Sequence, residues 1–174
     1  MKIMKSNCQL QKVLCLSLFV CVSLFLASCG DDSNSNPEKD VKSASTKASL
    51  VISQDLLDIA DLTITYIDET GVSKTEPLNA TTWNKTITQS KFPAKFSFQL
   101  SGTVKTNFDP NSKTSYEITR NLNIVPSFDG KPLKSISDYS TLPVPCDKIL
   151  TWLNNRGPSL IKASCTINSD GTLE

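Results

Sequence analysis

A regular alternation of apolar and polar side chains is the strongest constraint on the fold. In residues 95–104, Phe96, Phe98 and Leu100 share one parity, whereas lysine, serine, glutamine and threonine take the other. Successive side chains of a strand point to opposite faces, so this segment is predicted to be a half-buried strand. Residues 115–128 repeat the pattern. Arg120 interrupts their apolar face, which indicates either a bulge or a side chain that reaches past a sheet edge.

The remaining segments predict further short strands and one helix. Residues 106–114 are rich in turn formers, so we expect the two long strands to pair as a hairpin. Ile149, Trp152 and Leu153 have helical spacing, and Gly157 followed by Pro158 predicts the helix end. A helical turn is also expected within residues 53–61. The other predicted strands are 48–54, 62–68, 72–77, 83–89 and 160–168, with 72–77 at an edge because of Lys74 and Pro77.

This pattern predicts one domain, residues 48–174. Seven short antiparallel strands and one late helix favour a single β-sandwich, mainly β and of immunoglobulin-like or transthyretin-like type. The length suffices to build a core without disulfides.

The N-terminal residues are predicted to be a signal peptide. Residues 1–12 contain three lysines and no acid, and residues 13–27 are an apolar run too short to span a bilayer. The stretch Leu26-Ala27-Ser28-Cys29 resembles the lipobox of bacterial lipoproteins. That resemblance implies cleavage between Ser28 and Cys29 and lipidation of Cys29, with residues 1–28 removed. In that family the cysteine sulfur receives a diacylglyceryl group, and its two acyl chains give stable membrane anchoring.

Residues 29–47 are expected to be the lipidated cysteine and a flexible linker, because they contain almost no large apolar side chain. Asp31 and Asp32 resemble the acidic start of surface-exported lipoproteins of the Bacteroidota. They also suit an ordinary solvated linker, so either leaflet of the outer membrane stays open.

Composition excludes several classes of function. There is no histidine, which excludes Ser-His-Asp and Cys-His catalysis and every histidine-ligated metal site. Removal of Lys2, Lys5 and Lys12 with the signal leaves 15 basic and 17 acidic side chains, a charge of −2. This near-neutral balance argues against a nucleic-acid partner. No catalytic, metal or cofactor motif is visible, so we expect no enzyme and no cofactor.

Three groups of residues are candidate sites. Trp83 follows a polar stretch and is a candidate platform for a sugar ring, with core packing as the alternative. Asp55, Asp58 and Asp61 supply oxygen ligands of the kind calcium prefers, although helix capping also explains them. Cys146 and Cys165 remain after Cys29 is lipidated, so we expect a disulfide between them, with two separate buried thiols as the alternative.

The expected function is therefore binding without catalysis at the cell envelope. The partners would be the membrane, through the N-terminal lipid, and a glycan or an envelope protein. The alternative is a structural accessory subunit of an envelope complex, such as a pilus or a nutrient-uptake assembly.

Overall fold

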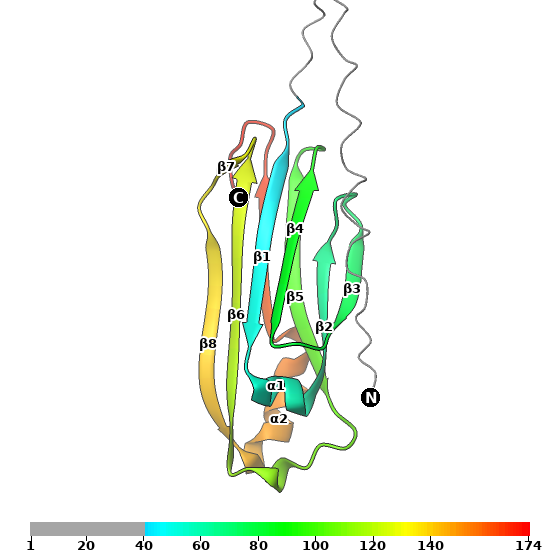
Figure 1. The fold of residues 1–174 in the computed structure, drawn as a ribbon, viewed down its shortest axis with the longest axis vertical. Helices are drawn as coiled ribbons and strands as arrows, with labels where there is room; N and C mark the ends of the chain where they lie inside the picture. Colours follow the sequence, from blue (N-terminus) through cyan, green and yellow to red (C-terminus); the bar gives the residue numbers. More distant parts are fainter. Residues whose placement is uncertain (1–40) are drawn as a thin grey trace, which may run out of the picture. The chain divides into compact units, whose positions relative to one another are not determined.

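The computed structural model describes residues 41–174, which form a sandwich of two antiparallel sheets (Figure 1). Sheet A has the order β4-β1-β6, and β7 and β8 both pair with the far side of β6; sheet B has the order β3-β2-β5-β9. The strands of sheet A are β1 (Ala44–Ile52), β4 (Thr82–Gln89), β6 (Ser115–Phe128), β7 (Lys131–Pro132) and β8 (Ile136–Pro145), and those of sheet B are β2 (Ala60–Ile67), β3 (Ser73–Leu78), β5 (Ala94–Val104) and β9 (Ile161–Ile167). The predicted β-sandwich is confirmed.

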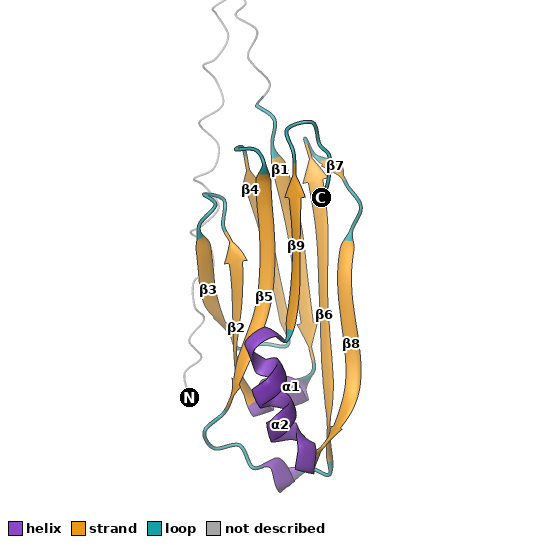
Figure 2. Ribbon diagram, turned by 180° about the vertical axis from the view of Figure 1, so that it is seen from behind, coloured by secondary structure: helices purple, strands orange, loops and turns teal. Residues whose placement is uncertain are grey.

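The helical segments gather at one end of the sandwich (Figure 2). They are α1 (Gln54–Ile59), α2 (Cys146–Arg156) and the 3-10 turns η1 (Pro110–Ser112) and η2 (Gly157–Ser159). The Ser53 side chain caps α1 by accepting a hydrogen bond from the Leu56 N–H. Helix α2 confirms the predicted C-terminal helix, and α1 confirms the predicted helical turn. In this part of the chain, no helix is both long and apolar enough to cross a bilayer.

The core fills the space between the two sheets. Phe96 and Phe98 of β5 are at most 1% exposed, and Tyr116 and Ile118 of β6 at most 2%. Burial of each such side chain contributes roughly 1.5–3 kcal/mol. The alternation seen in the sequence therefore identifies the inward face of both long strands correctly.

Two expectations about these strands are wrong. Strands β5 and β6 do not form a hairpin, because β5 lies between β2 and β9 while β6 lies between β1 and β8. The intervening segment crosses from sheet B to sheet A. The domain also begins earlier than residue 48, because β1 starts at Ala44 and pairs with both β4 and β6 from there.

Arg120 connects sheet A to the C-terminal helix. The register of β6 with β8 is continuous through this residue, so there is no bulge. The guanidinium Nη1 donates to the Leu160 carbonyl, and Cζ lies 5.8 Å from the centre of the Trp152 ring. Burial lowers the pKa of Arg120, and nearby Asp138 opposes this effect. The side chain thus fastens the end of α2 to the sandwich.

Candidate functional site

The outer face of sheet A is an open surface made mainly of hydrogen-bonding side chains. Residues of one parity on each strand form the core, so those of the other parity face solvent. We define the sheet A face as the part of this outward set given in the next sentence. Its residues are Ser45, Lys47, Ser49 and Val51 of β1, Thr82, Asn84, Thr86 and Thr88 of β4, Thr119, Asn121, Asn123 and Val125 of β6, and Ser137, Tyr139 and Thr141 of β8.

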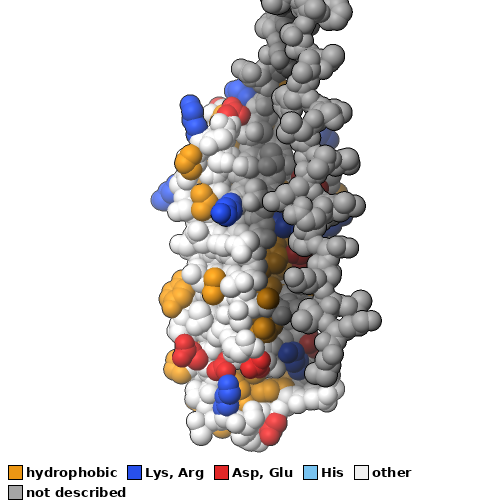
Figure 3. Space-filling view, viewed as in Figure 1, with side chains coloured by type: hydrophobic (Ala, Val, Ile, Leu, Met, Phe, Trp, Pro, Cys, Tyr) orange, Lys and Arg blue, Asp and Glu red, His pale blue; other side chains and the backbone are white. Residues whose placement is uncertain are grey.

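The strand register aligns these side chains in rows across the sheet. One row is Thr82, Val51, Asn121 and Tyr139, and the next is Asn84, Ser49, Asn123 and Ser137. Each row crosses four strands and is therefore about 14 Å long. No residue of either row is charged. Figure 3 shows this side of the molecule, and the middle of the face that is visible there carries few charged side chains.

Tyr139 is the exposed aromatic residue of this face. Its side chain is 66% exposed, whereas the other aromatic side chains of residues 41–174 are buried or partly buried. The Thr141 hydroxyl donates to the Tyr139 hydroxyl at 2.8 Å, and the Thr141 and Thr119 hydroxyls are 2.9 Å apart. Because Thr141 is two residues further along β8, this bond holds the ring along the strand. The result is an aromatic platform beside rows of amides and hydroxyls.

The outer face of sheet B is less open. Its exposed side chains include Asp61, Lys95 and Lys162, so it carries more charge. The η2 turn also covers one end of it, where Gln99 and Ser101 both donate to the Pro158 carbonyl. Sheet B therefore offers a natural comparison surface for tests of the sheet A face.

Two shallow hollows lie at the helical end of the domain, and the charged groups of the second are already bonded. One lies between α2 and β5 near Gly102 and Gly157. In the other, Lys105 donates to the Leu57 carbonyl at 2.7 Å and Lys113 donates to Asp55. These bonds fix the local fold and leave the sheet A face as the better candidate site.

Trp83 is not the exposed platform expected from the sequence. It shares the inward parity of β4 with Ile87, and its ring lies 5.8 Å from that of Tyr66 and 6.2 Å from that of Phe98. The indole N–H donates to Glu76. Glu76 also accepts from the Tyr66 hydroxyl at 3.2 Å. Trp83 thus closes one side of the sandwich, which is the core-packing alternative.

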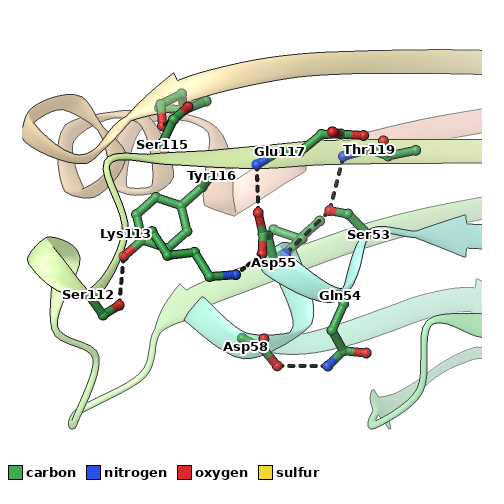
Figure 4. Close-up of polar contacts among 12 residues, drawn as sticks. Ser53, Gln54, Asp55, Asp58, Ser112, Lys113, Ser115, Tyr116, Glu117 and Thr119 are labelled. Atoms are coloured by element: carbon green, nitrogen blue, oxygen red, sulfur yellow. Dashed lines mark hydrogen bonds and ion pairs between the residues drawn. The ribbon is translucent and has the colours of Figure 1, made fainter.

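The structure does not bring Asp55, Asp58 and Asp61 together as one cluster. Asp55 accepts from Lys113 and from the Glu117 N–H, and Asp58 accepts from Gln54 (Figure 4). Partial burial acts to raise the pKa of Asp55, but the bonds from Lys113 and Glu117 outweigh it and lower that pKa. Across residues 41–174, no three potential metal ligands of the carboxylate or thiol type come together. Asp55 ties α1 to β6 through the Glu117 N–H, whereas Ser53 caps the helix.

The expected disulfide is also wrong. Cys146 and Cys165 are both free in the described part of the chain. Gly157, at the C-terminal end of α2, packs against Gly102 of β5. Cys146 lies at the other end of the helix, about 16 Å from Gly157. Cys165 pairs with Phe96, about 20 Å along β5 from Gly102, in the direction away from the helix (Figure 2). A disulfide requires Cα atoms within about 7 Å of each other. Burial raises the pKa of the Cys165 thiol, beside the Thr46 hydroxyl.

The sequence pattern did not identify Tyr139, because β8 was not among the predicted strands. A signal was present, since Ile136, Leu142 and Val144 share one parity and Tyr139 has the other. The Cys29 lipidation site, Ser28 and the linker aspartates lie outside the described residues.

Comparison with known proteins assigns no family to this chain. No model of a protein family matches the chain, and no curated protein is significantly similar to it.

Proposed function

We propose that this protein is a lipid-anchored, non-catalytic glycan-binding module of the bacterial cell envelope. Its binding surface is the sheet A face, and its ligand is a neutral, extended glycan. The observation that carries the proposal is Tyr139, an aromatic ring 66% exposed beside two uncharged rows of asparagine, serine and threonine. Sugars offer an apolar ring face and many hydroxyls, so an aromatic platform with neighbouring hydrogen-bonding groups suits them.

The absence of charge from the two rows supports a neutral ligand. A flat surface of amides and hydroxyls can donate and accept hydrogen bonds without the large desolvation cost of ions. An anionic ligand would instead be recognised by arginine or lysine side chains. Lys47 is the nearest cation on the face and lies in the row beyond Ser49.

Replacement of Tyr139 by alanine should weaken glycan binding about 30-fold, which corresponds to the loss of about 2 kcal/mol from an aromatic anchor. A glycan array identifies the ligand, and titration calorimetry of the wild type and Tyr139→Ala then measures the affinity. Asn123→Ala should also weaken binding, because Asn123 occupies the middle of the second row.

Matched controls come from other surfaces of the same domain. Leu150→Ala removes an apolar side chain that is 40% exposed on α2, and Ser97→Ala removes a polar side chain from the outer face of sheet B. Both variants should bind as the wild type does. Equal affinities of Tyr139→Ala and the wild type for the array ligand would contradict the proposed surface.

The lipid anchor has its own test. Replacement of Cys29 by alanine should abolish metabolic labelling with palmitate and leave the signal peptide uncut, because the cysteine sulfur accepts the first lipid. Labelling followed by gel autoradiography and N-terminal mass spectrometry measures both outcomes, and Cys8→Ala is the matched control within residues 1–28. Palmitate incorporation into Cys29→Ala would refute the anchoring site.

A second candidate function is a structural accessory subunit of an envelope complex. The outer edge of β4 favours it, because this strand has a partner on one side alone. Co-purification with a fixed envelope protein, together with no signal on the glycan array, would favour this alternative.

A further inference from the structure

Strand β4 is an open edge of sheet A. It pairs with β1, and no described residue forms a backbone hydrogen bond to its other side. The Ile52 N–H donates to the Thr81 carbonyl at 2.9 Å. The backbone N–H and C=O groups of the odd-numbered residues of β4 therefore point towards β1. Residues of an antiparallel ladder alternate in direction. The N–H and C=O groups of Thr82, Asn84, Thr86 and Thr88 therefore point outward from the edge.

The opposite edge of sheet A is interrupted by proline at one end. The Cys146 N–H donates to the Thr114 carbonyl at 3.1 Å, which places the even-numbered residues of β8 in the ladder with β6. The odd-numbered residues of β8 face the open edge, and two of them are Pro143 and Pro145. Proline has no N–H to offer a further strand, so pairing at this edge is discouraged.

The two edges of sheet B are each interrupted at one position as well. On β3, the bond from the Asp68 N–H to the Val72 carbonyl shows that odd-numbered residues face outward, which places Pro77 at the edge. On β9, Thr166 and Glu174 exchange two backbone hydrogen bonds, each 2.9 Å long. Among the four edges of the described sheets, β4 alone offers an uninterrupted row of outward N–H groups.

We propose that β4 of one molecule pairs antiparallel with β4 of a second copy, around a two-fold axis at Thr86. This pairing would join two A sheets into one continuous sheet. It concerns the backbone edge and does not depend on glycan binding by the sheet A face.

Charge disfavours one register of a second copy and is compatible with another. An axis at Lys85 would place the two Lys85 side chains directly opposite each other, which is unfavourable. An axis at Thr86 instead places Thr86 opposite itself, Asn84 opposite Thr88, and Lys85 opposite Ile87. Threonine pairs across strands are favourable, and no like charges meet. The edge is thus complementary to itself, as a two-fold interface requires.

The oligomeric state tests the proposal. The buried core lies within residues 41–174, so the soluble fragment 30–174 retains it and lacks both the signal and Cys29. Sedimentation velocity over a concentration series should show a monomer–dimer equilibrium. Thr86→Pro should be monomeric over the same series, because it removes the central outward N–H and leaves the bonds to β1 intact. Thr86→Val keeps the N–H and should still form the dimer.

Circular dichroism and thermal melting establish that each variant is folded. If proline at this position prevents folding, Thr86→Lys provides the same test, because it brings two positive charges together at the axis. A wild-type fragment that stays monomeric up to its solubility limit would overturn the proposal. So would a folded Thr86→Pro or Thr86→Lys variant that dimerises as strongly as the wild type.

Discussion

Replacement of Gly157 by alanine should destabilise the domain by about 3 kcal/mol and lower its Tm by roughly 10 °C. The backbone at Gly157 is helical, with φ −52° and ψ −39°. Helix propensity alone would therefore favour alanine by about 1 kcal/mol. However, a Cβ atom at this position would overlap the Gly102 carbonyl oxygen of β5. A backbone oxygen in a central strand cannot move aside easily, so the steric cost should reverse the sign.

Urea unfolding of the fragment 30–174 measures this effect, and Gly71→Ala is the control. Gly71 has φ +83°, and a Cβ atom there would meet no other atom within 4 Å, so alanine costs about 1 kcal/mol of backbone strain alone. A Gly157→Ala variant as stable as Gly71→Ala would show that the contact between η2 and β5 relaxes easily.

Gln89→Leu should cost about 3 kcal/mol although the two side chains have similar volumes. Gln89 is 7% exposed, and its amide nitrogen donates to the Asp68 and Lys95 carbonyls at 2.9 and 3.1 Å. Its amide oxygen accepts from the Lys95 N–H at 3.1 Å. The pairing of β2 with β5 ends at Phe98, so the Gln89 amide supplies the partner that β2 no longer provides. Leucine would leave these backbone groups unpaired beside the core, at about 1–3 kcal/mol each.

The matched control is Gln99→Leu. Gln99 also donates to a backbone carbonyl, that of Pro158, but this bond is exposed and water can replace it. The control should therefore change stability by less than about 1 kcal/mol. Similar losses in the two variants would mean that the bonds of Gln89 contribute no more than a surface contact.

Sequence alternation predicted which face of each strand is buried, but it did not predict which strands are neighbours. Phe96, Cys165 and Tyr116 all point inward as expected. Parity gives the face of a residue and not its position along the sandwich, so it could not show that Cys165 lies far from Cys146. It also could not show that the long strands β5 and β6 belong to different sheets, because that choice depends on pairings distant in sequence.

The candidate site was missed for a related reason. In β8, Asp138 and Ser140 occupy inward positions and weaken the apolar alternation, and Pro143 and Pro145 are unfavourable for a central strand. Both features are tolerated because β8 lies at an edge of sheet A, where Asp138 is exposed and Ser140 is half-buried. Trp83 could have been placed correctly, because it shares its parity with the buried Ile87.

The central position of β1 has a consequence for how the chain folds. This strand pairs with both β4 and β6. Its partners in β6 are distant in sequence, since Ala44 pairs with Phe128. In sheet B, the edge strand β9 pairs with β5 and is the last strand of the described residues. Domains dominated by such distant pairings fold in times on the order of milliseconds to seconds, since long loops must close before contacts form. A chain whose first strand needs a partner more than 60 residues away cannot complete its sheets early in synthesis, and the unfolded state is the one needed for translocation by the N-terminal signal that the sequence predicts.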